Sequence, residues 1–445
     1  MKRFILEQSK TEIYTSHSGL SLIGLCLNRF TSLGSTLAQS IPLRHGISHF
    51  DIVKSFVGLL SIGKSDFDAV EAFRKDPYFK ESLGIDHVAS SARLRQRLDE
   101  NAAAMLPLIY QSAVDFVVNA KAPVTPLSTG HVALDIDVFP MDNSKTVKEG
   151  VSRTYKGHDG YAPIAGYLGN EGWCLGCELR EGKQHCQKEF LYSLERMLDS
   201  ARCITTLPLL VRLDSGHDAL ETRVELAVEE NTDFILKWNP RKQNLESWLD
   251  YAEEHGCWKS PREGKRVATF SLYEEVEHQG KTHRFRKVVR MIERTIDKHG
   301  QMLLMPEIDL EGWWTQLDGV KYEDEKIIGL YRDHATSEQF HSEFKTDMDL
   351  ERLPSGKFAT NDLIMSMAAL SYNMLRWIGL IGLVGNISPV RHPAKRRRLK
   401  TVMQELMYLA ARVIRTGRRI KLRFSRHCPA FEAYETVYKL LAAGC

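Results

Sequence analysis

This 445-residue sequence lacks the features that mark secreted, fibrous or disordered proteins. Its eight cysteines are scattered without a disulfide framework, which favours a reducing, cytoplasmic location. The opening segment MKRFILEQSKTEIYTSHSGL contains no long apolar run, so we expect no secretory signal. With 43% hydrophobic and 26% charged residues, the composition is that of a soluble globular protein, and the length predicts two or three domains.

Long apolar runs are also rare, and only residues 363–384 resemble a membrane-spanning helix. Asn373 and Arg376 lie near the middle of this stretch, where an unpaired polar or charged group is costly in lipid. We therefore predict a helix buried in a protein core, and no membrane partner.

Zinc-binding motifs are sparse as well. Cys174 and Cys177 form a lone CxxC pair, with His185 and Cys186 nearby. These side chains could bind zinc, but no second CxxC pair completes a four-ligand site. The segment WCLGCELREG also fits a short strand that ends in a turn, and we favour that interpretation.

The net charge of only +3 hides an uneven distribution. Residues 391–426 contain 13 lysines and arginines and one glutamate, a net charge of +12, which leaves −9 for the rest of the chain. A basic tail on a mildly acidic body favours a polyanionic partner, and we predict that Arg396, Arg397 and Arg398 bind nucleic acid. The alternative is a solvated basic helix without such a role.

Hydrophobic periodicity predicts mainly helices over residues 1–125 and an α/β fold after them. Arg93, Arg95 and Arg97, near the start of one predicted helix, suggest a helix-turn-helix reader of DNA, although a generic helical bundle fits equally. Four segments follow from these patterns. They are a helical DNA-binding domain (1–125), a catalytic core (126–239 and 326–360), a β-rich insertion (240–325), and C-terminal helices with the basic tail (361–445).

Acidic side chains end two predicted apolar strands, and a third acid begins a predicted helix. Asp135 and Asp137 lie two residues apart on one face of the first strand, Asp214 ends the second, and Glu338 is on the helix. Carboxylates brought together repel one another unless a hard divalent cation neutralises them, and oxygen ligands suit Mg²⁺ or Mn²⁺. Two such ions can cut and join phosphodiesters. A helix cap, a turn residue or a surface ion pair is the alternative for each acid.

A spaced signature then sharpens the interpretation. Tyr331, His334, Glu338 and Lys345 are separated by two, three and six residues. This spacing resembles the Tyr-Arg-Glu-Lys signature of DDE transposases from bacterial insertion sequences, in the group that cuts through a hairpin intermediate. LDIDVF and VRLDSGHD resemble the two aspartate strands of that group, and FATNDLIMSMAALSYNML resembles the helix that follows the glutamate. The likeness spans roughly residues 130–425.

The resemblance implies a ribonuclease-H-like mixed-sheet core with a β-rich insertion between Asp214 and Glu338. It also implies that Asp137, Asp214 and Glu338 are the catalytic metal ligands, with two Mg²⁺ or Mn²⁺ ions per site. Asp135 is the alternative to Asp137 as the first metal ligand. His334 stands where the family signature has an arginine. The positive charge of that arginine could instead come from Arg332. The predicted DNA contacts are Tyr331, Arg332, His334, Lys345, Arg396, Arg397 and Arg398. The tryptophans available to stack a flipped base are Trp238, Trp248, Trp258, Trp313 and Trp314.

The function implied is cut-and-paste transposition. Such an enzyme would act, as a homodimer on DNA, on double-stranded terminal inverted repeats and target DNA in the bacterial cytoplasm, associated with the nucleoid. Three alternatives stay open: a related nuclease that cuts without joining, an inactive DNA-binding regulator derived from a transposase, and a nucleic-acid scaffold driven by the basic tail.

Overall fold

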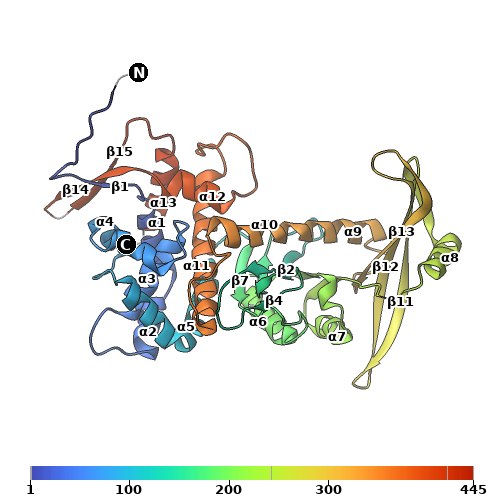
Figure 1. The fold of residues 1–445 in the computed structure, drawn as a ribbon. Coiled ribbons are helices and arrows are strands. Elements are labelled where there is room, and N and C mark those ends of the chain that lie inside the picture. Colours follow the sequence, from blue (N-terminus) through green and yellow to red (C-terminus); the bar gives the residue numbers. More distant parts are fainter. Residues whose placement is uncertain (1–2, 242, 418, 444–445) are drawn as a thin grey trace.

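The computed structural model describes residues 3–241, 243–417 and 419–443. Figure 1 shows an elongated molecule with the N-terminal and C-terminal helices at one end, a mixed sheet in the middle and long strands at the other end. The predicted α/β class is therefore confirmed as a mixed fold with one large sheet and many helices. No measurement yet tests the division into four segments, which stays a prediction.

Helices make up most of the first 125 residues. Short polar side chains begin several of them: Ser48, Asp76 and Ser90 each accept a hydrogen bond from a backbone N–H in the first turn. The helices are α1 (Leu20–Phe30), α2 (Leu33–Ser40), α3 (His49–Leu60), α4 (Pro77–Leu83) and α5 (Ser91–Asn119). The 29-residue α5 packs along the buried C-terminal helix α11 (Phe358–Leu383), so it is a core helix of a bundle.

The apolar stretch near residue 370 is a core helix. Two helices, Ser91–Asn119 and Phe358–Leu383, are long and apolar enough to cross a membrane, and 89% of the most apolar part of the second is buried inside the protein. Asn373 on α11 donates to the backbone oxygens of Cys174 and Ala113 and accepts from the Cys174 N–H at 2.9 Å. The polar side chain in the middle of this helix is therefore satisfied by protein, as the prediction of a buried helix requires.

The central sheet has nine strands in the order β10-β11-β12-β13-β9-β8-β2-β6-β7. The five strands from β9 to the edge of the sheet at β7 are β2 (Val132–Val138), β6 (Ile164–Leu168), β7 (Trp173–Glu178), β8 (Leu209–Leu213) and β9 (Thr232–Lys237). β2, β8 and β9 run parallel to one another, whereas β6 pairs antiparallel with β2 on one side and with β7 on the other. The connecting helices α6 (Phe190–Ile204) and α7 (Leu220–Val228) provide the crossovers that parallel strands need.

Long strands extend this sheet after β9. The helix α8 (Leu245–His255) leads into β10 (Cys257–Arg262), β11 (Lys265–His278), β12 (Lys281–Ile296) and β13 (Met302–Thr315). β13 pairs with β9 through Trp313 and Lys237, so the inserted strands continue the core sheet. Figure 1 shows them at the end of the molecule farthest from the N-terminal helices.

A nearly continuous helical segment returns from the inserted strands to the core (Figure 1). It consists of α9 (Asp324–Arg332), a 3₁₀ turn (Asp333–Ala335), α10 (Thr336–Ser342) and a π-helical turn (Glu343–Asp347). We call these residues, 324–347, the glutamate helix because they contain Glu338. A π turn within a helix is often found at functional sites.

The C-terminal region differs from the predicted helices. After α12 (Leu399–Val402), β14 (Ala411–Thr416) and β15 (Arg419–Phe424) form a hairpin that pairs with β1 (Ile13–Thr15), and α13 (Phe431–Ala442) ends the described chain. The segment RIKLRF alternates basic and apolar residues, which is the period of a strand, and its high charge concealed this pattern. ARVIRT follows the pattern only in part, because Val413 and Ile414 are consecutive apolar residues. Arg418, part of the predicted basic tail, lies outside the described residues.

Candidate active site

Asp137 and Asp214 emerge side by side from the central sheet. β2 and β8 are parallel neighbours whose last paired residues are Ile136 and Leu213, so the next residue on each chain is one of the two aspartates. Paired strands lie about 4.8 Å apart, which brings the two carboxylates together at the carboxyl edge of the sheet. The strand register therefore places Asp137 and Asp214 at adjacent strand ends.

Glu338 approaches the same edge from the glutamate helix. His334, four residues earlier, has Nδ1 3.0 Å from Asp135 Oδ1, and His341, three residues later, has Nδ1 3.8 Å from Asp137 Oδ2. Residues three and four apart share a helix face. Glu338 therefore lies between two contacts with β2, on the face that is turned toward the aspartates.

Asp137 interacts electrostatically with both Asp214 and Glu338. The pKa of Asp137 is raised to about 6, chiefly by burial and further by the charges of Asp214 and Glu338, against the opposing charge of His334. A carboxyl group with such a pKa is one whose ionised form lacks a neutralising partner. The electrostatics thus identify Asp137, Asp214 and Glu338 as one cluster of negative charge.

This donor set suits a hard divalent cation, because it consists of carboxylate oxygens whose repulsion a cation would relieve. Within the described residues, no three His, Cys, Asp or Glu side chains are already arranged to hold a metal ion. The oxygens of Asp137 and Asp214 instead accept hydrogen bonds from the next backbone N–H, of Val138 at 2.7 Å and of Ser215 at 2.6 Å. Rotation of these side chains would be needed for all three acids to share one ion.

Asp135 has a different environment from Asp137. Its two oxygens each lie 2.6 Å from the Arg212 guanidinium, and its side chain is buried. Burial opposes ionisation, but Arg212 and His334 outweigh it and lower the pKa of Asp135. Arg212 also donates to the Leu330 carbonyl at 2.7 Å, which ties the sheet to α9. Asp135 is therefore a structural ion-pair partner, and Asp137 is the acid available to a metal.

The remaining signature residues surround this cluster. Tyr331 is half-buried, with its ring centre 6.1 Å from that of Trp313, and Arg332 is exposed. His334 is buried against Asp135, so its ring faces the protein interior. Lys345 Nζ lies 3.2 Å from the Pro140 carbonyl oxygen and 3.5 Å from Glu351. The structure brings the four signature positions together on the glutamate helix.

The three arginines predicted to bind nucleic acid make contacts inside the protein. Arg396 donates to the Asn170 carbonyl at 2.8 Å and to Gln339 at 3.2 Å. Arg397 is buried and donates to the Leu383 carbonyl at 2.8 Å. Arg398 pairs with Asp347 at 2.8 Å. Arg397 is thus inaccessible to DNA in this structure, and the other two hold the tail against the glutamate helix.

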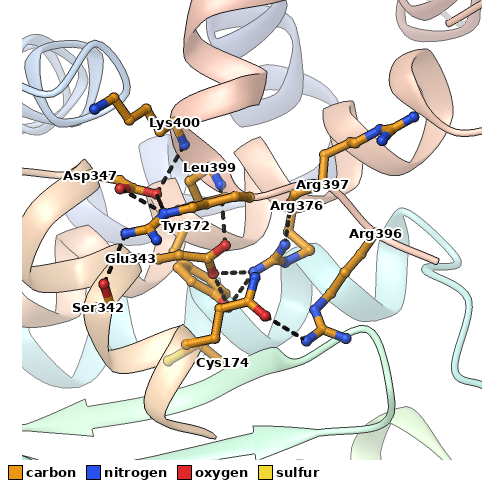
Figure 2. Close-up of polar contacts among 12 residues, drawn as sticks. Cys174, Ser342, Glu343, Asp347, Tyr372, Arg376, Arg396, Arg397, Leu399 and Lys400 are labelled. Atoms are coloured by element: carbon orange, nitrogen blue, oxygen red, sulfur yellow. Dashed lines mark hydrogen bonds and ion pairs between the residues drawn. The ribbon is translucent and has the colours of Figure 1, made fainter. Parts of the chain in front are cut away.

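A fully buried ion pair lies beneath these arginines. Figure 2 shows Glu343 of the π turn bonded to Arg376 of α11, and both side chains are at most 1% exposed. Arg376 also bonds to Tyr372 and to the Arg397 carbonyl, while Glu343 accepts from the Leu399 N–H at 3.2 Å. This network joins α11, the glutamate helix and the tail. The sequence signal for it was the arginine within the apolar stretch.

The tryptophans and cysteines mostly belong to the core. Trp238, Trp313 and Trp314 are buried. Trp248 on α8 and Trp258 on β10 are half-buried against the core. The CxxC cysteines Cys174 and Cys177 are buried in β7. Both cysteines lie within strand β7, so the strand interpretation of this segment is confirmed.

The fold and site together define a mixed α/β protein with a three-carboxylate centre at the carboxyl edge of its sheet. The family model described as "Transposase DDE domain group 1" matches residues 6–444, and the chain belongs to this transposase family. Among solved structures, the chain is similar to the piggyBac transposase in a synaptic complex with hairpin DNA, determined by cryo-EM. The identity is 10%, the TM-score is 0.38, and the match covers 90% of this chain and 82% of that one. No curated protein matches the chain.

Proposed function

We propose that the protein cleaves DNA at the terminal inverted repeats of its element and joins the freed 3′ ends to target DNA. The observation that carries this proposal is the charge coupling of Asp137 to Asp214 and Glu338 at adjacent strand ends. Membership of the DDE transposase family supports the same chemistry. A metal-dependent centre of this kind can serve both hydrolysis and transesterification of a phosphodiester.

The core is proposed to be ribonuclease-H-like. The order β7-β6-β2-β8-β9, with an antiparallel hairpin on one side of β2 and parallel strands on the other, supports this assignment. In that arrangement the first strand lies at the centre of the core, so Asp137 at its end stands over the middle of the sheet. Asp214 and Glu338 then approach it from the adjacent strand and from the glutamate helix.

Asp137, Asp214 and Glu338 are proposed to hold two Mg²⁺ or Mn²⁺ ions. These ions would lower the pKa of the attacking water or 3′-hydroxyl and stabilise the leaving oxygen. The protein itself orients the acids, because Asp135, Arg212 and His334 tie the two strands to the glutamate helix. Rigid placement of the reacting groups for in-line attack is itself a large part of catalysis.

Tyr331, Arg332 and Lys345 are proposed to contact DNA phosphates near the scissile bond. Lys345 lies on the glutamate helix beyond Glu338, and Arg332 is exposed before it. His334 would contribute positive charge through space, because burial against Asp135 keeps it from bonding a phosphate directly. The proposed partner is double-stranded DNA, bound by a homodimer because an element has two ends.

Metal-dependent cleavage of a supercoiled plasmid carrying the element's ends tests this function. The full-length protein should nick and linearise the plasmid with Mg²⁺, and strand-transfer products should follow. Asp214→Asn and Glu338→Gln should each abolish cleavage but bind the ends, whereas Asp333→Asn, an exposed acid on the glutamate helix, should cut normally. Cleavage without joined products would indicate a nuclease, and binding without cleavage by the wild type would indicate an inactive regulator.

A further inference from the structure

A tight hairpin loop beside the acids presents an exposed tyrosine. β4 (Ser152–Arg153) and β5 (Asp159–Tyr161) are antiparallel, and the Thr154 N–H and hydroxyl both donate to the His158 carbonyl, at 2.9 and 2.8 Å. The Gly157 N–H donates to the Thr154 carbonyl, and Gly157 takes the left-handed conformation that closes the turn. Tyr155 and Lys156 therefore stand at the tip of a fixed loop.

The base of this hairpin is packed tightly against the core. The Lys183 N–H donates to Ser152 Oγ at 2.9 Å, and a Cβ atom on Gly182 would lie 2.1 Å from the Ser152 carbonyl oxygen. The Tyr161 ring at the other end of β5 is fully buried, with its hydroxyl donating to the Glu149 carbonyl at 2.8 Å. Such anchoring means that the position of Tyr155 is set before any ligand binds, which lowers the entropic cost of binding.

Tyr155 shares a pocket with two of the three acids. A cavity of about 500 Å³ is lined by Asp137, Asp214, Tyr155, Lys183, Cys186 and His217, among others. The Tyr155 side chain is 67% exposed, so one face of its ring is open to a ligand. Partial burial in this pocket and then the charges of Asp137, Asp214 and Glu338 raise the pKa of Tyr155 to about 12, which keeps its hydroxyl neutral at physiological pH.

The negative charge of Asp137 and Asp214 determines which part of a nucleotide can enter this pocket. A phosphate would be repelled by the acids unless cations lay between them, but a nucleobase is neutral and has an apolar face. The exposed cations stand at the rim: Arg153 and Lys156 on the hairpin and Lys183 on the neighbouring loop. Lys156 Nζ lies 5.4 Å from the Tyr155 ring centre, so a cation stands beside the ring.

We propose that Tyr155 is a stacking platform for an unpaired nucleobase next to the scissile phosphate, with Lys156 and Lys183 contacting the adjoining backbone. The proposal rests on the function given above, because it takes DNA as the ligand. Stacking on an aromatic ring tolerates any base, so this contact would hold the opened strand end without reading its sequence.

Binding of DNA with an unpaired end tests this role without cleavage. The probe is a duplex with a short single-stranded 3′ overhang that carries 5-iodouracil, mixed with the full-length protein in the absence of divalent cations. We expect illumination to cross-link the base to Tyr155, identified by mass spectrometry. We also expect Tyr155→Ala to weaken overhang binding about tenfold, relative to a blunt duplex of the same length. Tyr155→Phe should bind as the wild type does, because the ring is retained.

The control is Tyr192→Ala, which removes another exposed tyrosine on α6. Equal overhang affinity for wild type and Tyr155→Ala, or equal losses for the Phe and Ala variants, would overturn the stacking role. Plasmid cleavage by the wild type is measured in parallel, and its absence would count against the proposed function alone. The binding comparison decides the role of Tyr155 in either case.

Discussion

The Arg212 guanidinium donates two hydrogen bonds of 2.6 Å to the carboxylate of Asp135. Asp135 lies two residues before Asp137 on the same strand. This ion pair separates two acids that look equivalent in the sequence, because it neutralises one and leaves the other beside Asp214. Asp135→Asn should therefore lower the free energy of unfolding by about 3 to 5 kcal/mol, since it leaves Arg212 buried without its anionic partner. Asp137→Asn should abolish cleavage without this loss, and thermal unfolding with a plasmid assay on both variants checks the contrast.

The raised pKa of Asp137 makes stability depend on pH. Its folded pKa of about 6 exceeds the unfolded value of about 3.9, so the folded protein holds the proton more tightly between these limits. Stability in the absence of divalent cations should thus fall by about 2 to 3 kcal/mol as pH rises from 4 to 6. Denaturant unfolding in EDTA measures this slope, and Asp137→Asn should flatten it. An unchanged slope in that variant would place the coupled group elsewhere.

His334 should cause a second loss of stability, in the same direction, at higher pH. Burial lowers its pKa, but the bond and charge of Asp135, followed by the charge of Asp137, outweigh burial and leave the pKa raised. A raised histidine pKa gives stability that is fully present below pH 6.5 and is lost as pH rises through the folded value. His334→Gln, which keeps a donor but not the charge, should remove this loss. NMR titration of the imidazole protons gives the pKa directly.

Exposed and buried arginines of the tail should affect DNA binding differently. Arg391 is exposed, whereas Arg397 is buried against backbone carbonyls. If Arg391 contacts a phosphate, Arg391→Gln should weaken DNA binding and reduce the salt dependence of the affinity by about one counterion. Arg397→Gln should lower the melting temperature and leave that salt dependence unchanged. Affinity measured over a range of salt concentrations, with thermal unfolding, separates the two effects.

The Glu343–Arg376 pair should matter to catalysis through the placement of Glu338. Removing one partner, as in Glu343→Gln, leaves a buried charge and should cost about 3 to 5 kcal/mol of stability. The double change Glu343→Gln with Arg376→Met should recover much of that stability. Cleavage should nevertheless stay slow in the double variant with DNA affinity unchanged, because the glutamate helix has lost its anchor. Full recovery of the cleavage rate would show that the pair serves folding alone.

Much of the acid centre was accessible from the sequence. Apolar strands that end in Asp137 and Asp214, and the spacing from Tyr331 to Lys345, predicted these acids, and the strand register places the two aspartates at adjacent strand ends. The choice between Asp135 and Asp137 was not accessible, because it depends on Arg212 reaching across from the neighbouring strand. Tertiary contacts of this kind leave no local pattern in either segment.

The basic tail is a second case in which tertiary contacts could not be predicted from the sequence. Charge density correctly marked residues 391–426 as unusual, but it could not show that Arg396, Arg397 and Arg398 contact the protein's own carbonyls and carboxylates. Asp347, the partner of Arg398, lies 51 positions earlier in the chain. Tyr155 was missed because a single aromatic residue in a loop gives no signal until the fold brings it to the acids.

Metal-ion rescue tests most directly whether the acid at residue 214 is a metal ligand. A thiolate binds Mg²⁺ poorly but accepts softer Mn²⁺ better, so Asp214→Cys should be inactive in plasmid cleavage with Mg²⁺ and regain activity with Mn²⁺. Asp333→Cys should cut equally well with either ion. Cleavage by Asp214→Cys with Mg²⁺ at the wild-type rate would contradict the account, because the carboxylate at that position would then have no part in holding the ion.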